Sequence, residues 1–222
     1  MNEVKSKDYH DYFIKDGRFI GRFEEMYQNV ADPWHIDDLG RRLDMDAALL
    51  LLQYSGREYS QILDAGCGKG LFTSFLARET GGLVLAGDVS PTAVEQARAR
   101  NRDPRIEFIV LDLNRLDDLD RPRGRFDLIV LAQTIWCILP NLEKILAGFL
   151  DLLQPGGGLL ISQNFLQPGQ QKYGREIVAG PEDLLALLTR AGFDIKQTLE
   201  ANRFQNHHLA VLAEKPSRPV AP

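Results

Sequence analysis

A glycine-rich loop gives this sequence its clearest chemical signature. The run from Ile62 to Gly70, ILDAGCGKG, places a short apolar strand directly before three glycines, and a helix is predicted to begin near Leu71. Glycines let the backbone approach a ligand closely, and a helix N-terminus offers unpaired N–H groups. The loop alone is consistent with either a ligand site or a tight strand-to-helix turn. The residues around it distinguish these two interpretations.

Three aspartates beside this loop favour a ligand that carries a ribose. Asp88 ends the next predicted strand, where a carboxylate can accept hydrogen bonds from both ribose hydroxyls. Asp112 ends the third strand, where it contacts an adenine ring or caps the following helix. Asp64 precedes the glycines and either holds a cationic group, directly or through water, or braces the loop.

The glycine spacing separates two classes of cofactor. A dinucleotide fingerprint reads G-x-G-x-x-G, whereas the glycines here read G-x-G-x-G and position 71 is Leu. A carboxylate at Asp64 would repel a pyrophosphate but attract an ammonium group. The sequence therefore predicts a ligand with a cation and no phosphate, and it disfavours a nicotinamide dehydrogenase.

Short apolar runs alternate with helical stretches from Gln61 onward, which indicates a parallel sheet with helices on both faces. The predicted strands cover residues 62–66, 83–89, 106–112, 126–132, 159–162, 193–200 and 207–213. The predicted helices cover residues 71–80, 91–101, 141–153 and 181–191. Only residues 201–206 separate the last two strands, too few for a crossover helix, so these strands must form an antiparallel hairpin. We expect an α/β fold with a seven-stranded, mostly parallel sheet.

Five motifs in order make residues 60–214 resemble the class I, Rossmann-like S-adenosylmethionine-dependent methyltransferases, in a type 11/12-like small-molecule branch. The motifs are DAGCGKG at 64–70, GDVS around Asp88, LDLN around Asp112, FDLIVLAQ at 126–133 and LQPGGGLLIS at 153–162. The resemblance implies strand order 3-2-1-4-5-7-6 with strand 7 antiparallel, and S-adenosyl-L-methionine as cofactor, released as S-adenosyl-L-homocysteine. It also implies a set of cofactor-binding residues: Asp64, Gly66, Gly68, Gly70, Asp88, Val89, Asp112, Leu113 and Gln133.

Residues 1–58 precede the cofactor domain (59–214), and a Pro-rich, flexible tail (215–222) follows it. The first segment is predicted to be helical, with recurring aromatics at Tyr9, Tyr12, Phe13, Phe19, Phe23 and Tyr27. These aromatics either close over the site or pack on the sheet. The stretch from Asp32 to His35 is similar to bacterial methyltransferases that act on sugars and secondary metabolites. We expect residues 1 to about 36 to form a mobile cap.

Candidate acceptor residues follow from the rule that ligands lie beyond the carboxyl ends of parallel strands. Gln133 and Thr134 follow the fourth strand and should border the reactive methyl, while Trp136 is an acceptor wall or core. His207 and His208 begin the reversed strand, and only one of them can face the pocket. The predicted catalytic residues are His207, His208 and Gln133, and the predicted substrate residues are Trp34, His35, Trp136, Asn164, Tyr173 and Arg203. Asn164 and Tyr173 fall in a predicted loop over residues 163–180, and Asp127 is interpreted as structural.

The charge balance narrows the choice of partners. Lys and Arg number 26 against 31 Asp and Glu, for a formal net charge of -5, which gives no global attraction to nucleic acid. Cys67 and Cys137 are predicted to be reduced thiols, no apolar run approaches a membrane span, and no metal-ligand spacing is visible. We expect a cytoplasmic, metal-independent enzyme, a monomer or homodimer, that methylates an O or N atom of a small molecule, with a sugar or secondary metabolite favoured. The alternatives are a protein or RNA methyltransferase and a non-catalytic cofactor-binding regulator.

Overall fold

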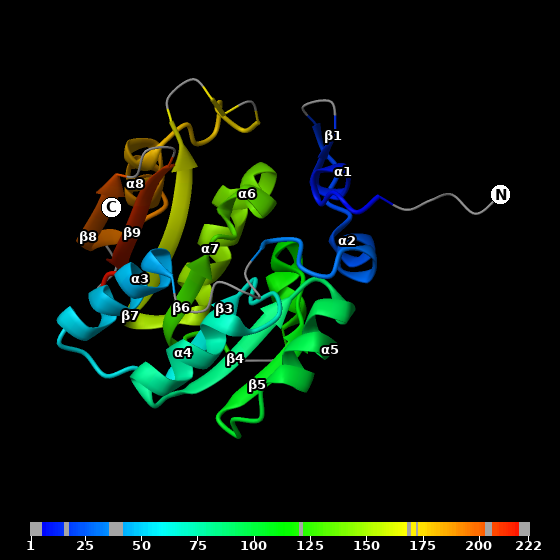
Figure 1. Ribbon diagram of the computed structural model, residues 1–222. Helices are drawn as coiled ribbons and strands as arrows, with labels where there is room; N and C mark the ends of the chain where they lie inside the picture. The colour runs from blue at the N-terminus through cyan, green and yellow to red at the C-terminus, as the bar shows by residue number, and fades with distance from the viewer. Residues whose placement is uncertain are drawn as a thin grey trace.

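The computed structural model in Figure 1 contains a seven-stranded sheet of order β5-β4-β3-β6-β7-β9-β8. Its strands are β3 (Gln61–Ala65), β4 (Leu83–Asp88), β5 (Ile106–Val110), β6 (Phe126–Ala132), β7 (Leu153–Leu166), β8 (Asp194–Asn202) and β9 (Asn206–Glu214). Strand β9 runs antiparallel to both of its neighbours, and the other strand pairs are parallel. The predicted order and the terminal hairpin are confirmed. The structure describes residues 6–15, 18–35, 42–119, 122–167, 170–171, 173–202 and 206–217.

Helices cover both faces of the sheet, as the alternating pattern predicts. One face carries α3 (Leu43–Tyr54), α4 (Leu71–Thr80) and α5 (Pro91–Arg100). The other carries α6 (Ile135–Ile138), α7 (Leu142–Leu152) and α8 (Pro181–Arg190), with the short 3-10 turns η1 (Leu113–Asp118) and η2 (Leu139–Asn141). The central strands β3 and β6 are buried almost throughout, because a parallel sheet is covered on both sides.

Local signals fix the helices that border the glycine loop. Helix α4 begins after Gly70 and ends before Gly81, and both glycines adopt a left-handed backbone, with φ of 76° and 71°. Helix α5 begins with Pro91, and the Ser90 hydroxyl accepts the Ala93 N–H at 3.1 Å. These ends place the start of each helix beside the carboxyl end of the strand before it.

Strand β7 is longer than its sequence predicts. It runs from Leu153 to Leu166, and its pairing with β9 continues as far as Leu166 opposite Asn206. The expectation that residues 163–180 form one loop is therefore wrong for residues 163–166, because the ladder to β9 holds them extended. Asn164 consequently lies on strand β7, and the pairing with His208 of β9 fixes its position.

The N-terminal segment (residues 6–35) forms a small unit beside α5, on the right of Figure 1. It contains α1 (His10–Phe13), β1 (Ile14–Lys15), β2 (Arg18–Phe19) and α2 (Phe23–Asn29). The region contains helices, as predicted, and β1 and β2 add an antiparallel hairpin that the sequence did not predict. The buried side chains of this segment pack on Ala93 of α5. The predicted boundary between an N-terminal cap (1–58) and the cofactor domain (59–214) stays a prediction.

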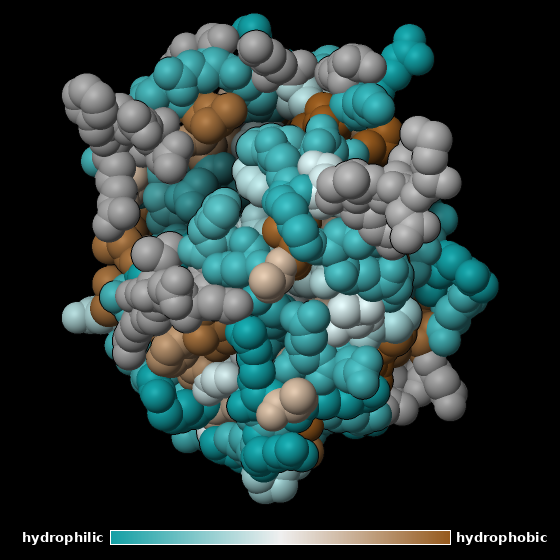
Figure 2. Space-filling model, turned by 45° about the vertical axis from the view of Figure 1, so that its right-hand side comes forward, coloured by the Kyte–Doolittle hydropathy of each residue, from teal (hydrophilic) through white to brown (hydrophobic). Residues whose placement is uncertain are grey.

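Hydrophilic residues cover most of the face shown in Figure 2, and hydrophobic ones appear there in separate patches. Large exposed apolar side chains include Leu50 and Tyr54 on α3 and Leu83 at the start of β4. Among the described helices, none has the length and apolar character that a membrane span requires. A cavity lies at the carboxyl ends of the strands.

Candidate active site

A cavity of about 830 Å³ opens where the strand order reverses between β3 and β6. In open α/β sheets, ligands bind at this switch point. Of the residues predicted from sequence for the cofactor and acceptor sites, those that line the cavity are Trp34, Asp64, Gly66, Gly68, Asp88, Val89, Asp112, Leu113, Gln133, Thr134, Trp136 and Asn164. The structure therefore brings together most of the predicted site.

The glycine loop is built for close backbone approach. Gly66 and Gly68 have φ of 85° and 53°, in the region that L side chains rarely adopt. A Cβ on Gly66 would lie 2.6 Å from the Thr134 side chain, and one on Gly68 would lie 3.0 Å from the Tyr27 hydroxyl. Gly70, the third predicted glycine, does not line the cavity and instead lies at the N-cap of α4.

Asp64 is a buried carboxylate below the loop, with 1% of its surface exposed. Its Oδ2 accepts a hydrogen bond of 2.6 Å from the Thr73 hydroxyl. Burial raises the pKa of Asp64 to about 6; the bond from Thr73 opposes the rise, and the charge of Asp88 adds to it. A carboxylate held in this way is stabilised when a cationic ligand enters the cavity.

Asp88 bonds the glycine loop and also lines the cavity. Its Oδ2 accepts the Gly68 N–H and its Oδ1 accepts the Ser90 N–H, each at 2.9 Å. Burial raises its pKa, while these backbone bonds lower it. Asp88 therefore braces the glycine loop and at the same time presents a carboxylate to the cavity.

Asp112 adopts the helix-capping arrangement and also lines the cavity. Its Oδ1 accepts bonds from the backbone N–H and the side-chain amide of Asn114, each at 2.9 Å. Leu113 and Val89 lie beside it on the cavity wall, and Val89 is 43% exposed. The cap and the predicted adenine contact are compatible, because a carboxylate accepts more than one bond.

Gln133 occupies a strained position directly after β6. Its φ of 58° is unusual for a residue with a side chain, and such strain clusters at functional sites. Its Oε1 accepts the Asn164 N–H at 3.1 Å, and its Nε2 is buried without a hydrogen-bond partner among the described residues. Gln133 is thereby fixed against β7 with an amide donor still available.

Trp136 and Asn164 form one wall of the cavity. The indole N–H of Trp136 donates to the Asn164 carbonyl at 3.0 Å, and the ring meets Phe165 edge to face at 5.5 Å between centroids. Trp136 also packs against the large core cluster. It therefore fills both roles considered from the sequence, core residue and cavity wall.

The two histidines of β9 point to opposite sides, as strand geometry requires. His208 is 3% exposed, and its Nδ1 lies 3.0 Å from the Asn164 Oδ1. His207 instead places Nε2 2.7 Å from the exposed Glu200. Neither histidine lines the cavity, and His208 stands directly behind Asn164. The prediction that they are catalytic remains untested, and the geometry favours His208.

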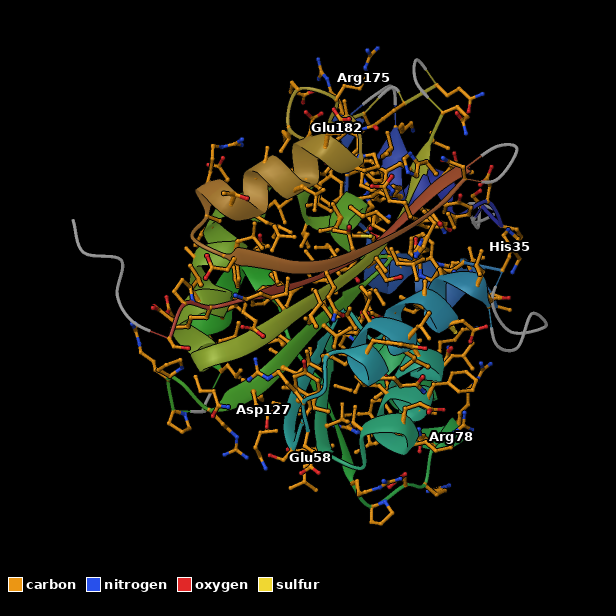
Figure 3. All side chains as sticks on the ribbon, turned by 90° about the vertical axis from the view of Figure 1, so that its left-hand side faces the viewer. His35, Glu58, Arg78, Asp127, Arg175 and Glu182 are labelled. Atoms are coloured by element: carbon orange, nitrogen blue, oxygen red, sulfur yellow. The ribbon has the colours of Figure 1, made fainter. Side chains whose placement is uncertain are left out.

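Two other predicted substrate residues, His35 and Tyr173, do not line the cavity. His35 is exposed and projects from the N-terminal segment (Figure 3). Tyr173 packs against Phe13 and Phe19, with ring centroids 6.3 and 5.9 Å away. Arg203 lies outside the described residues. Tyr173 thus supports the aromatic wall from behind.

Asp127 has the structural role that its position suggests. It accepts bonds from the Ser60 N–H and hydroxyl at 2.8 Å and from the Gln61 N–H at 3.0 Å. Figure 3 shows it near Glu58, at the end of the molecule away from His35. It joins β6 to the start of β3 and is distant from the cavity chemistry.

The two cysteines line the cavity but are poor nucleophiles. Burial raises the pKa of the Cys67 thiol well above its ordinary value and that of Cys137 to about 12. Both are free cysteines that stay protonated at neutral pH. They serve as small side chains in a tight part of the site.

Sequence reasoning missed several residues that hold the N-terminal segment on the loop. Lys69, only 2% exposed, donates to the Ala31 carbonyl at 2.9 Å and lies 3.5 Å from Asp32. Glu24 accepts bonds from the Ser90 hydroxyl at 2.5 Å and the Thr92 hydroxyl at 2.7 Å. A lysine among glycines was the only local signal, since these pairs join distant parts of the sequence.

Asp88→Ala should weaken S-adenosylhomocysteine binding at least about tenfold, because charge-assisted hydrogen bonds contribute roughly 1.5–3 kcal/mol each. The variant also releases the Gly68 and Ser90 N–H groups, so circular dichroism must show that it is folded. Calorimetry measures the affinity. Unchanged affinity in a folded variant would confine Asp88 to bracing the loop.

This fold and this site define a class I, S-adenosylmethionine-dependent methyltransferase, and a family model described as a methyltransferase domain matches residues 62–157. The chain is 28% identical to nodulation protein S of Rhizobium tropici over 169 residues, 75% of this chain and 68% of that protein. It is 25% identical to methyltransferase GfsG of Streptomyces halstedii over 226 residues, 91% of this chain and 78% of that protein. The crystal structure of N-methyltransferase NodS from Bradyrhizobium japonicum WM9 with S-adenosyl-L-homocysteine aligns with a TM-score of 0.65 at 25% identity, covering 83% of this chain and 92% of that one.

The residues present fit the cofactor of this class. The glycine loop offers backbone without side chains, Asp64 is a buried carboxylate suited to a cation, and Asp88 lies where a ribose is bound in this fold. When bound, S-adenosylmethionine supplies a methyl group already activated by its sulfonium. The protein's remaining work is to place an acceptor and exclude water.

Proposed function

We propose that this enzyme methylates an N or O atom of a small molecule, with a sugar or secondary metabolite favoured, without a metal ion. The observation that carries the proposal is the lining of the cavity, which combines aspartates with aromatic rings. The similarity to nodulation protein S and GfsG supports it. We expect a cytoplasmic monomer or homodimer.

In this proposal Asp88, Val89, Asp112 and Leu113 bind the nucleoside, and Asp64 with the glycine loop binds the amino acid part. Gln133, Trp136 and Asn164 face the acceptor. Trp34 completes the site from the N-terminal segment, where its indole N–H donates to the Tyr27 hydroxyl at 2.8 Å. His208 is the better placed of the two proposed bases, because it contacts the cavity wall through Asn164.

The N-terminal segment acts as a cap over the site. Its aromatic side chains Tyr9, Phe13, Phe19 and Phe23 line the cavity, and Glu24 and Lys69 fasten it to the loops that hold the cofactor. An acceptor under this cap is shielded from water on the side that the sheet leaves open. A large acceptor such as folded RNA or protein would have to displace it.

Calorimetry should show S-adenosylmethionine and S-adenosylhomocysteine binding at about micromolar Kd, with no binding of NAD. The expected selectivity follows from Asp64 and the G-x-G-x-G spacing, which suit a cation and repel a pyrophosphate. The enzyme is then incubated with methyl-labelled cofactor and a library of sugars, amines and phenols. Methylation of RNA or protein substrates, with none of the small molecules modified, would contradict the proposed acceptor class.

A further inference from the structure

A second polar cluster lies across the strand-order switch from Asp88 and Asp112. Arg42 and Asp44 come from the start of α3, and Ser162 and Asn164 from β7; all four line the cavity. The Arg42 Nε donates to Asp44 Oδ1 at 2.9 Å, and its Nη2 bonds Oδ2. The cluster therefore belongs to the end of the cavity away from the nucleoside site.

The Asp44 carboxylate is buried yet ionised. Burial alone would raise its pKa, but the hydrogen bonds and the charge of Arg42 outweigh burial and lower the pKa. The backbone holds the residue as well, because the Ser162 hydroxyl donates to the Asp44 carbonyl at 3.0 Å. Asp44 is thus a fixed anion at the cavity wall.

The neighbouring amide groups are also oriented. Asn164 Oδ1 can only accept a hydrogen bond, so the 3.0 Å contact places the proton on His208 Nδ1 and turns the Asn164 amide nitrogen away from that contact. Gln133 Oε1 accepts from the Asn164 backbone, which leaves its Nε2 as a donor. Asp44 is consequently the anionic acceptor group in a wall that otherwise offers donors.

The whole cavity carries negative charge. Among its described lining residues, the charged ones are the four aspartates Asp44, Asp64, Asp88 and Asp112 and the single arginine Arg42. An anionic group placed beside them would be repelled, whereas a hydrogen-bond donor or a cation would be attracted. The aromatic rings opposite this wall provide an apolar surface for the rest of the ligand.

We propose that Asp44 is the acceptor-binding carboxylate, which accepts a hydrogen bond from an N–H or O–H group of the methyl acceptor and makes the site reject anionic acceptors. This inference rests on the proposed small-molecule function. Arg42 also lines the cavity, and in this arrangement it is a positioning residue because its Nε and Nη2 both bond the Asp44 carboxylate.

Three ring compounds of matched size test the proposal on the full chain loaded with S-adenosylhomocysteine. Ligand-observed NMR measures the Kd of benzylamine, benzyl alcohol and benzoate. Benzylamine should bind at least about tenfold more tightly than benzyl alcohol, and benzoate more weakly than both. Asp44→Asn should bring benzylamine to within about threefold of benzyl alcohol, whereas its S-adenosylhomocysteine affinity should stay within twofold of the wild type.

Asp46→Asn is the matched control, because Asp46 lies on the same helix but does not line the cavity. This variant should keep the wild-type order of the three ligands. Equal binding of benzoate and benzylamine, or an order unchanged by Asp44→Asn, would overturn the assignment of Asp44. Loss of cofactor affinity in Asp44→Asn would overturn it too, by moving Asp44 into the cofactor site. Failure of the wild type to bind any of the three would contradict the small-molecule function itself.

If Asp44→Asn fails to fold, Asp44→Glu provides the second measurement. The longer carboxylate keeps the charge and the bond to Arg42, so it should retain the preference for benzylamine over benzoate. Loss of that preference in a folded Asp44→Glu variant with normal cofactor affinity would also overturn the proposal.

Discussion

Asp64→Asn is expected to make the protein more stable at neutral pH and a poorer binder of its cofactor. Burial raises the pKa of Asp64 from an ordinary 3.8 to about 6, so the folded state holds a proton that the unfolded state has lost between these values. The free energy of unfolding therefore falls as pH rises through this window, by about 1.4 kcal/mol per pH unit and roughly 3 kcal/mol in total. Asparagine does not titrate, so the variant should not show this decrease in the free energy of unfolding.

The same variant should lose the pH dependence of cofactor binding. In the wild type, S-adenosylhomocysteine affinity should rise several-fold between pH 5 and pH 7, because only the ionised Asp64 attracts the ligand's ammonium group. Asp64→Asn should bind with a flat pH profile and at least about tenfold more weakly at pH 7. Calorimetry and thermal denaturation at four pH values measure both effects.

Asp127→Asn is a matched control on the neighbouring strand β6. Asp127 is also buried and hydrogen-bonded, but it joins β6 to β3 at the end of the sheet away from the cavity. Its replacement should lower stability and leave cofactor affinity unchanged. If Asp64→Asn behaves like this control, with lower stability and normal affinity, Asp64 is a brace and not a ligand-binding group.

The residues of the cofactor half of the site are predictable because a single rule for parallel sheets gives their location. Ligands in a parallel sheet lie beyond the carboxyl strand ends, and Asp64, Asp88 and Asp112 each stand at or near such an end. The alternating pattern and the short 201–206 connection likewise predict a parallel sheet that ends in an antiparallel hairpin, and the family resemblance implies the strand order. These are local signals, readable within about ten residues of each motif.

The acceptor half is less predictable because its contacts are distant in sequence. Asp44 meets Ser162 because α3 packs on the sheet, and Glu24 meets Ser90 because α2 packs on α5. Neither α3 nor α2 carries a motif, and the β1–β2 hairpin is only two residues per strand, too short for a periodic signal. The sequence predicts a loop at Asn164 because the long antiparallel ladder between β7 and β9 is not visible in the sequence of β7 alone.

Lys69→Met is expected to loosen the cap and to weaken cofactor binding together. Lys69 lies inside the glycine loop, yet its ammonium group contacts Ala31 and Asp32 of the N-terminal segment. Methionine keeps the apolar stem but removes the charge, which leaves the Ala31 carbonyl without this bond and Asp32 without this cation. Breaking a buried charged pair is strongly destabilising, so the cap should detach more often.

Two measurements test whether the cap and the cofactor site are coupled, as opposed to a general loss of stability in the variant. Limited proteolysis within residues 6–35 should be at least about tenfold faster in Lys69→Met than in the wild type, if the lost charged bond contributes about 1.5 kcal/mol. Saturating S-adenosylhomocysteine should protect the wild-type segment, and the Kd for the cofactor should rise by a similar factor in the variant, because the cap and the loop are linked.

Lys196→Met is the control, since Lys196 lies on β8 and pairs with Asp194 and Glu214, outside the cavity wall. It should leave proteolysis and cofactor affinity unchanged. A Lys69→Met variant with wild-type proteolysis but weaker cofactor binding would place Lys69 in the cofactor site alone. Faster proteolysis with unchanged affinity would instead show that the cap moves independently of the glycine loop, and exclusion of water would then depend on the acceptor side of the cavity.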